Sequence, residues 1–146
     1  MQKMRFRISH EDWPGIEAEN LWVDELVDGH FKINSIPFYV YGVSTGDVVA
    51  ATMVNGRLEF DSVVSRSGHS TYRVLIANEQ GPESPAFAFL WQRLAALGCS
   101  NEVAKRRWVA IDIPATTNAD SVYGILEVGA HEGVWTFDEG HCGHPL

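Results

Sequence analysis

The fold expected for this chain follows from one stretch, Ser84-Pro85-Ala86-Phe87-Ala88-Phe89-Leu90-Trp91-Gln92-Arg93-Leu94-Ala95-Ala96-Leu97-Gly98. Ser84 is a favoured helix N-cap, Pro85 suits the first helical position, and Gly98 is typical just beyond a helix C-terminus. The apolar residues between them recur every three or four positions, which is helical spacing. We therefore predict an amphipathic helix with a buried stripe of Phe87, Leu90, Leu94 and Leu97, beside which Trp91 is either at the edge of the core or an exposed anchor.

Strand and helix signals continue on both sides of this helix. A β-rich run stands at 72–76, and a second helix begins at the cap Asn118 and stops at Gly129. Further strands are predicted at 101–104, 108–113 and 134–137. The resulting order, β-α-β-β-α-β, predicts a ferredoxin-like unit, in which both helices cover one face of a four-stranded antiparallel sheet.

The first half of the chain carries hairpin signals instead. Asp28-Gly29 and Asn55-Gly56 are dipeptides that favour two-residue hairpin turns, and each lies between two runs of strand-forming residues. These runs are 21–27 and 30–34 around the first turn, 48–54 and 57–64 around the second, with a further apolar run at 38–43. Residues 8–20 read as an irregular lead-in. We predict an antiparallel sheet or half barrel here.

The predicted fold class is therefore α+β. An N-terminal antiparallel β subdomain at 1–71 precedes a ferredoxin-like subdomain at 72–146, and the two form one compact unit.

Three segments carry a resemblance to a known family. They are the run from Ile36 to Val49, the run from Arg66 to Val74, and the stretch from Leu94 to Glu102 that passes through Leu97-Gly98-Cys99. Together they resemble small bacterial proteins grouped as a domain of unknown function, number 4265, over about residues 20–140. The resemblance implies no settled activity and no established site residues.

The charge of the chain limits its partners. Eleven Lys and Arg stand against 19 Asp and Glu, for a formal net charge of -8. Such a balance disfavours nucleic acid and anionic membranes and favours a basic protein, a cation or a neutral small molecule, although acidic surfaces also serve solubility alone. The last basic residue is Arg107, so the C-terminal quarter is an acidic surface unless its carboxylates pair with the rest of the fold.

The compartment expected is the cytoplasm. No signal peptide follows the charged first residues, and no apolar stretch is long enough to span a membrane. Two cysteines, Cys99 and Cys142, do not form a disulfide framework, so both are expected as free thiols.

The densest group of chemically active side chains lies in Asp138-Glu139-Gly140-His141-Cys142-Gly143-His144. Imidazole and thiolate suit zinc, so His141, Cys142 and His144 are candidate ligands, with His131 and Asp138 as additional ones. Glu139 would orient a ligating histidine. The alternatives to zinc binding are that this segment is a solvated polar tail, or that it has an acid–base or interface role. No cofactor is expected, and zinc is the alternative to that expectation.

A second polar segment runs from Ser65 to Thr71. Its hydroxyls and backbone N–H groups favour an anion-binding concavity, and Arg66 adds a planar fork for a carboxylate or phosphate. His69 and Thr71 match half of the paired signature of two-histidine phosphoesterases, but no second copy is present. The alternative is a polar β-turn that satisfies its own backbone.

Three classes of function remain, since no catalytic motif is complete. The favoured one is a protein-binding module, most sharply an immunity or inhibitor protein that neutralises a basic, nuclease-type bacterial toxin. A metal-binding protein or hydrolase using the C-terminal cluster is the second, and a ligand sensor that forms a homodimer through its sheets is the third. The candidate partner- or anion-binding residues are Arg66, Ser67, His69, Ser70, Asp120, Glu127, Glu132, Asp138 and Glu139.

Overall fold

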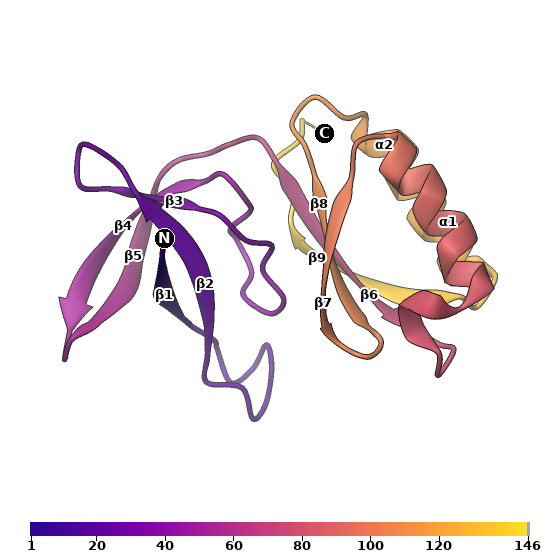
Figure 1. Ribbon diagram of the computed structural model, residues 1–146, viewed down its shortest axis with the longest axis horizontal. Coiled ribbons are helices and arrows are strands. Elements are labelled where there is room, and N and C mark those ends of the chain that lie inside the picture. The colour runs from indigo at the N-terminus through magenta and orange to yellow at the C-terminus, as the bar shows by residue number, and fades with distance from the viewer. Residues whose placement is uncertain (146) are drawn as a thin grey trace.

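Five strands in the first half of the chain close into a barrel in the computed structural model, which describes residues 1–145 (Figure 1). Neighbouring strands pair in chain order, and the barrel closes where Arg5 pairs in parallel with Glu59. Alternate residues of each strand point inward, so the interior is apolar, with Met4, Phe6 and Ile33 fully buried. The strands are β1 (Gln2–Arg7), β2 (Ala18–Glu25), β3 (Phe31–Ile33), β4 (Val48–Val54) and β5 (Arg57–Ser65).

The two-residue hairpin at Asn55-Gly56 is confirmed, whereas the hairpin at Asp28-Gly29 forms with a longer connection, because β2 ends at Glu25 and β3 begins at Phe31. Asn55 and Gly56 have φ angles of 50° and 77°, as the turn between β4 and β5 requires. Gly29 has a φ of 86° in the turn between β2 and β3. Glycine and asparagine are favoured at these positions because other residues rarely adopt a positive φ.

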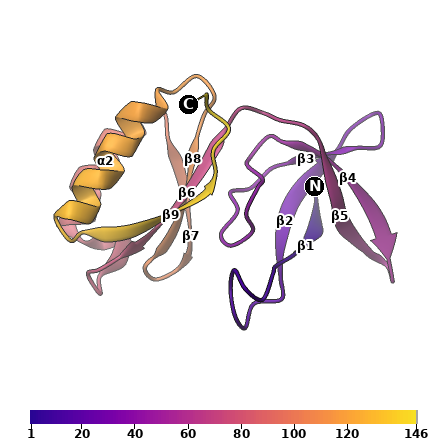
Figure 2. The same ribbon diagram turned by 180° about the vertical axis from the view of Figure 1, so that it is seen from behind.

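The second half builds a four-stranded sheet in the order β7-β8-β6-β9. Two helices cover the face of this sheet that is turned away from the barrel (Figures 1 and 2). Their buried residues join those of the strands in a second apolar core, separate from that of the barrel. The elements are β6 (Ser70–Ile76), the short 3-10 helix η1 (Gly81–Glu83), α1 (Pro85–Ala96), β7 (Ser100–Lys105), β8 (Trp108–Ile113), α2 (Ala119–His131) and β9 (Trp135–His141).

Both helices begin where their caps predict. The Ser84 side chain accepts a hydrogen bond from the Phe87 backbone N–H, and Asn118 does the same for Ser121. Phe87, Leu90 and Leu94 are buried on α1, as expected from their spacing. No helix in residues 1–145 is long and apolar enough to cross a membrane.

The predicted fold class is wrong for this chain. Five strands close into a barrel, and the structure is mostly β with two α-helices in residues 1–145. The predicted α+β class, with a half barrel and a ferredoxin-like unit, does not describe that architecture. The prediction missed β1, whose outward positions are charged: Lys3, Arg5 and Arg7 alternate with buried Met4 and Phe6. Without β1 the sheet has no strand to close it.

The strand predicted at 38–43 is also wrong, because this segment is an ordered loop. The buried carboxylate of Glu19 accepts hydrogen bonds from the backbone N–H groups of Phe38, Tyr39 and Val40, at 2.6 to 2.9 Å. A side chain therefore takes the place of a neighbouring strand as hydrogen-bond partner.

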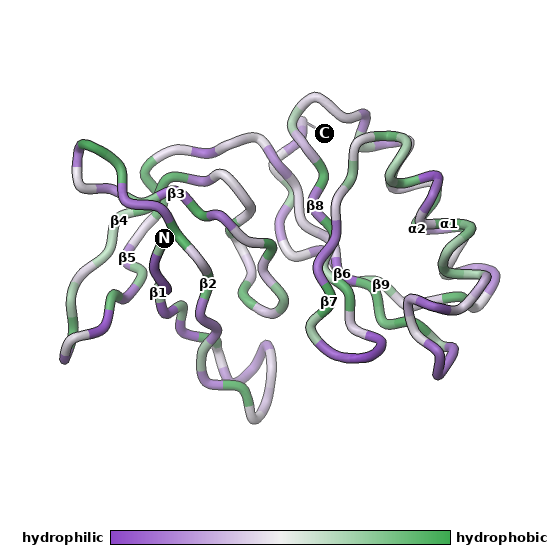
Figure 3. Tube along the Cα trace, in the orientation of Figure 1, coloured by the Kyte–Doolittle hydropathy of each residue, from purple (hydrophilic) through white to green (hydrophobic). Residues whose placement is uncertain are grey.

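The basic turn Lys105–Arg107 between β7 and β8 is strongly hydrophilic (Figure 3). Arg106 and Arg107 donate to the backbone oxygens of Glu79 and Ala77, so this turn is tied to the segment before η1.

Candidate functional site

The polar segment between β5 and β6 crosses from the barrel to the sheet (Figure 1). Its donors, predicted to bind an anion, surround the carboxylate of Asp47, whose side chain is only 1% exposed. Ser67 N–H donates to Asp47 Oδ1 at 2.9 Å, and Ser44 N–H donates to Oδ2 at 2.9 Å. Arg66 Nη1 lies 3.2 Å from the same Oδ2 and also donates to the Gly42 oxygen. The protein's own carboxylate thus occupies the concavity.

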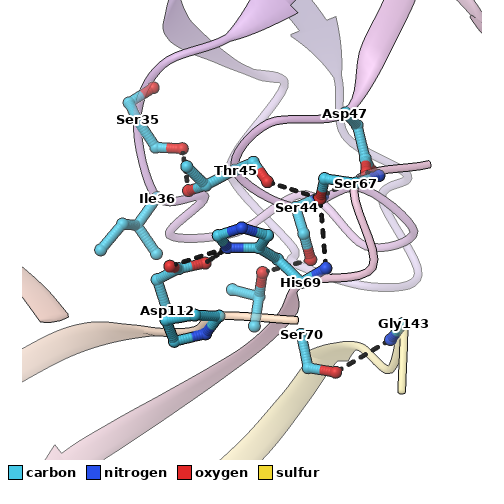
Figure 4. A network of polar contacts seen from close by, with 12 residues as sticks. Ser35, Ile36, Ser44, Thr45, Asp47, Ser67, His69, Ser70, Asp112 and Gly143 are labelled. Atoms are coloured by element: carbon cyan, nitrogen blue, oxygen red, sulfur yellow. Dashed lines mark hydrogen bonds and ion pairs between the residues drawn. The ribbon is translucent and has the colours of Figure 1, made fainter. Parts of the chain in front are cut away.

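His69 hydrogen-bonds a second buried carboxylate at this crossing. Its Nδ1 lies 2.9 Å from both carboxylate oxygens of Asp112, which is on β8 and almost fully buried (Figure 4). Burial raises the pKa of Asp112, and the hydrogen bond from His69 opposes that rise. The pair joins the crossing segment to the sheet.

Ser70 is linked to the C-terminal tail. Its Oγ is 2.6 Å from His144 Nδ1 and accepts from the Gly143 N–H at 2.9 Å. The other ring nitrogen of His144, Nε2, lies 2.9 Å from the Pro114 oxygen. A serine, an imidazole and an orienting oxygen recur in hydrolases, but the Ser70 residue is 1% exposed, so its hydroxyl is closed to a substrate.

The predicted zinc ligands do not converge. Both nitrogens of His144 have protein partners, and Cys142 Sγ donates to the His144 oxygen at 3.6 Å. Burial and the nearby Arg66 lower the pKa of His141. Within residues 1–145 no three His, Cys, Asp or Glu side chains are grouped as a metal site requires.

The two carboxylates that begin the tail are engaged with β6. Asp138 forms an ion pair with Arg73 and accepts a hydrogen bond from the Tyr41 hydroxyl at 2.9 Å. Glu139 accepts a hydrogen bond from the Tyr72 hydroxyl at 2.7 Å, and burial together with this bond raises the pKa of Tyr72. Asp138 is one third exposed and Glu139 is exposed, but each carboxylate is held by a β6 side chain, Arg73 or Tyr72.

The remaining acidic candidates are exposed on α2 and, in the case of Glu132, at its C-cap. Asp120, Glu127 and Glu132 are all exposed, and none forms an ion pair with another described residue. Tyr123 and Val128, 42% and 38% exposed, lie among them. We call these five residues the α2 surface. A shallow hollow that includes part of this surface is lined by Gly124, Glu127, Val128, His131 and Glu132.

Sequence reasoning did not identify the buried charged residues at the crossing. Arg73, Asp112 and Asp47 are all buried. The signal that was available is a charged residue inside an apolar strand, as in Tyr72-Arg73-Val74 and Ile111-Asp112-Ile113. Such a residue is rarely buried without a partner, which predicts a pair but does not name the partner.

The sequence matches the family described as Domain of unknown function (DUF4265) over residues 19–137. The chain belongs to this family. The membership expected from the resemblance is thereby confirmed, and the family description assigns no activity. No curated protein matches the chain.

A solved structure shares the fold of this DUF4265 member. It is described as a novel crystal structure of a hypothetical protein from Neisseria gonorrhoeae, with a TM-score of 0.79 and 21% sequence identity. The match covers 97% of this chain and 94% of that one. At this identity the similarity shows the fold alone, so the barrel and the sheet occur together in another protein.

Proposed function

We propose that this protein is a protein-binding module that captures a basic protein, and that it acts as an immunity or inhibitor protein against a nuclease-type bacterial toxin. The observation that supports the proposal is the α2 surface, where three exposed carboxylates without ion-pair partners among residues 1–145 occur together with the exposed side chains of Tyr123 and Val128.

The spacing of the α2 surface suits recognition. Asp120, Tyr123 and Glu127 are three and four positions apart, so they share one face of the helix. Asp120 and Glu127 are two turns apart, which separates them by about 10 Å along the axis. An aromatic ring between two carboxylates offers a basic partner both an apolar contact and charge complementarity.

The α2 surface is also held rigidly. Val122, Ile125 and Leu126 on the opposite side of α2 are buried in the core of the sheet. A surface that keeps its shape loses little entropy on binding. On a nuclease, the carboxylates would occupy the positions that nucleic acid phosphates take. They would thereby prevent the nuclease from binding its substrate.

The experiment compares three proteins as baits in the lysate of the source cell. They are the native protein, a surface variant with Asp120→Asn, Glu127→Gln and Glu132→Gln, and a control with Glu11→Gln, Glu17→Gln and Glu25→Gln. The control removes the same charge from exposed positions of the barrel half. We expect the native protein and the control to retain one basic protein at 1:1 stoichiometry.

Association kinetics of the purified complex then test whether long-range electrostatic attraction by the α2 surface speeds binding. The association rate should fall as salt rises, and the surface variant should associate about tenfold more slowly or worse. Equal rates for the surface variant and the control, or a rate independent of salt, would contradict the proposal.

The alternatives from the sequence have less support in the geometry. A metal site or hydrolase in the tail requires His144 and Ser70, which hydrogen-bond each other and other buried groups. A sensor dimer built by stacking two sheets requires the face opposite the helices. The loops of the barrel already lie on that face, where Trp108 Nε1 donates to the Phe38 oxygen at 3.1 Å.

A further inference from the structure

The outer surface of the barrel carries a cationic hollow that lies away from α2. It opens at the place where β1 and β5 meet, has a volume of about 290 Å³, and is lined by Lys3, Arg5 and Arg57 together with the neutral donors Gln2 and Asn20. No Asp or Glu of the described chain is among its lining residues. We propose that this hollow binds a small molecule through a phosphate group.

Barrel closure creates the hollow. The only paired position between β1 and β5 is Arg5 with Glu59, in parallel register. Beyond that pair, toward Gln2 and Arg57, the two strands have no further paired residues, so they leave space between them. Lys3 and Arg5 project there because the residues that alternate with them, Met4 and Phe6, are buried inside the barrel.

Two of the three cations are held in position. Arg5 Nη1 lies 3.1 Å from Glu59 Oε1, and the Glu59 residue is 9% exposed, so a nearly buried carboxylate orients the guanidinium. Lys3 Nζ stands 5.0 Å from the centre of the Trp22 ring, a cation–π contact. The Arg57 side chain has no hydrogen-bond or ion-pair partner in residues 1–145, which leaves its donors open to a ligand.

The charge of the hollow selects the class of ligand. Glu59 neutralises about one cation, which leaves an excess of about two positive charges, and a phosphate monoester carries about −1.5 to −2 at neutral pH. A monocarboxylate carries a single negative charge, so it neutralises only about half of that positive excess. Guanidinium groups also form paired hydrogen bonds with phosphate oxygens.

The size of the hollow and the charge of the chain exclude a polymer as ligand. A volume of 290 Å³ is close to the lower limit of about 300 Å³ for small-molecule sites. The rest of the surface is acidic, with a net charge of -8 for the chain, and repels a long polyanion that extends beyond the hollow. This inference does not depend on the proposed function of the α2 surface.

The test is calorimetric titration of the full chain with pyrophosphate, inorganic phosphate and acetate. We expect one site for pyrophosphate and phosphate and no measurable binding of acetate. Arg57→Gln and Lys3→Gln should each weaken phosphate binding about tenfold or more, because each removes a charged hydrogen-bond donor. Arg93→Gln removes an exposed cation from α1 and should leave binding unchanged.

Thermal unfolding of each variant shows that it is folded, and all three positions are exposed. The absence of phosphate binding by the native protein would overturn the proposal. So would equal affinity in Arg57→Gln and Arg93→Gln, or acetate binding as tight as phosphate.

Discussion

Arg73 on β6 and Asp138 on β9 occupy paired positions in the sheet and form an ion pair, with Nη2 3.0 Å from Oδ2. The Arg73 side chain is completely buried, whereas Asp138 is one third exposed. The guanidinium also donates to the Tyr39 and Val40 backbone oxygens and lies 4.7 Å from the centre of the Tyr41 ring. One side chain of the sheet therefore holds the loop that continues from the barrel.

Replacing Arg73 should weaken both the sheet and its contact with the barrel. Arg73→Met leaves the loop oxygens without their donor and leaves Asp138 with only the Tyr41 hydroxyl, and we expect the free energy of unfolding to fall by about 3–5 kcal/mol. Urea unfolding followed by Trp fluorescence measures this. Asp138→Asn should cost about 1.5–3 kcal/mol, since the buried Arg73 guanidinium loses its carboxylate but keeps its backbone acceptors. Equal costs for the two variants would show that the ion pair, and not the loop contact, dominates.

Two glycines of α2 should respond in opposite directions to alanine. A Cβ at Gly129 would stand 2.4 Å from the buried Trp135 ring, whereas a Cβ at Gly124 meets nothing within 4 Å. Gly124→Ala should therefore raise the free energy of unfolding by about 0.5–1 kcal/mol through helix propensity. Gly129→Ala should lower it by about 1–3 kcal/mol through overpacking. A stabilised Gly129→Ala variant would contradict the close packing of Trp135.

The His69–Asp112 pair predicts a pH dependence of stability. Burial raises the folded-state pKa of Asp112 above the 3.8 of the unfolded chain, although His69 opposes the rise. Between 3.8 and the raised value the folded protein binds more protons, so this group stabilises less as pH rises through that window. Asp112→Asn removes the titration of this group, so the stability of the variant relative to the native protein should increase as pH rises from 3.8 through the raised pKa of Asp112.

The stability of a His69→Ala variant relative to the native protein should change with pH in the opposite direction. His69→Ala leaves the Asp112 carboxylate without its hydrogen bond, so its cost should be about 1–3 kcal/mol near neutral pH and smaller near pH 4, where protonation of Asp112 is favoured. Urea unfolding at several pH values measures both variants. A cost of His69→Ala that does not change with pH would show that Asp112 does not titrate in this range.

The two cysteines should differ in reactivity. Cys99 is buried, and burial, together with the charge of Asp112, raises the pKa of its thiol to about 11. At pH 8 only about one molecule in a thousand carries the thiolate, the form that reacts. Cys142 is only half-buried. Iodoacetamide at pH 8 should therefore add one group, on Cys142, as read by mass spectrometry, and none to a Cys142→Ser variant. Labelling of folded Cys142→Ser would contradict the burial of Cys99.

The amino-acid sequence by itself determined the local elements. Ser84 and Asn118 predicted where both helices begin, because a cap and the N–H group that it satisfies lie within three residues. Asn55-Gly56 predicted a hairpin turn because a positive φ is required at those two residues themselves. The DUF4265 resemblance was also visible in the residues alone.

Only the tertiary structure decided how these elements close and which charges are buried. Arg5 and Glu59, which close the barrel, are 54 residues apart, and Arg73 and Asp138 are 65 apart. Nothing near either residue in the chain indicates its partner, since a strand edge or a buried charge can be satisfied by any segment that the fold brings near. The same reason explains why Asp138 and Glu139, predicted as binding residues, are engaged by Arg73 and Tyr72 of β6, while Asp120, Glu127 and Glu132 remain exposed without ion-pair partners in residues 1–145.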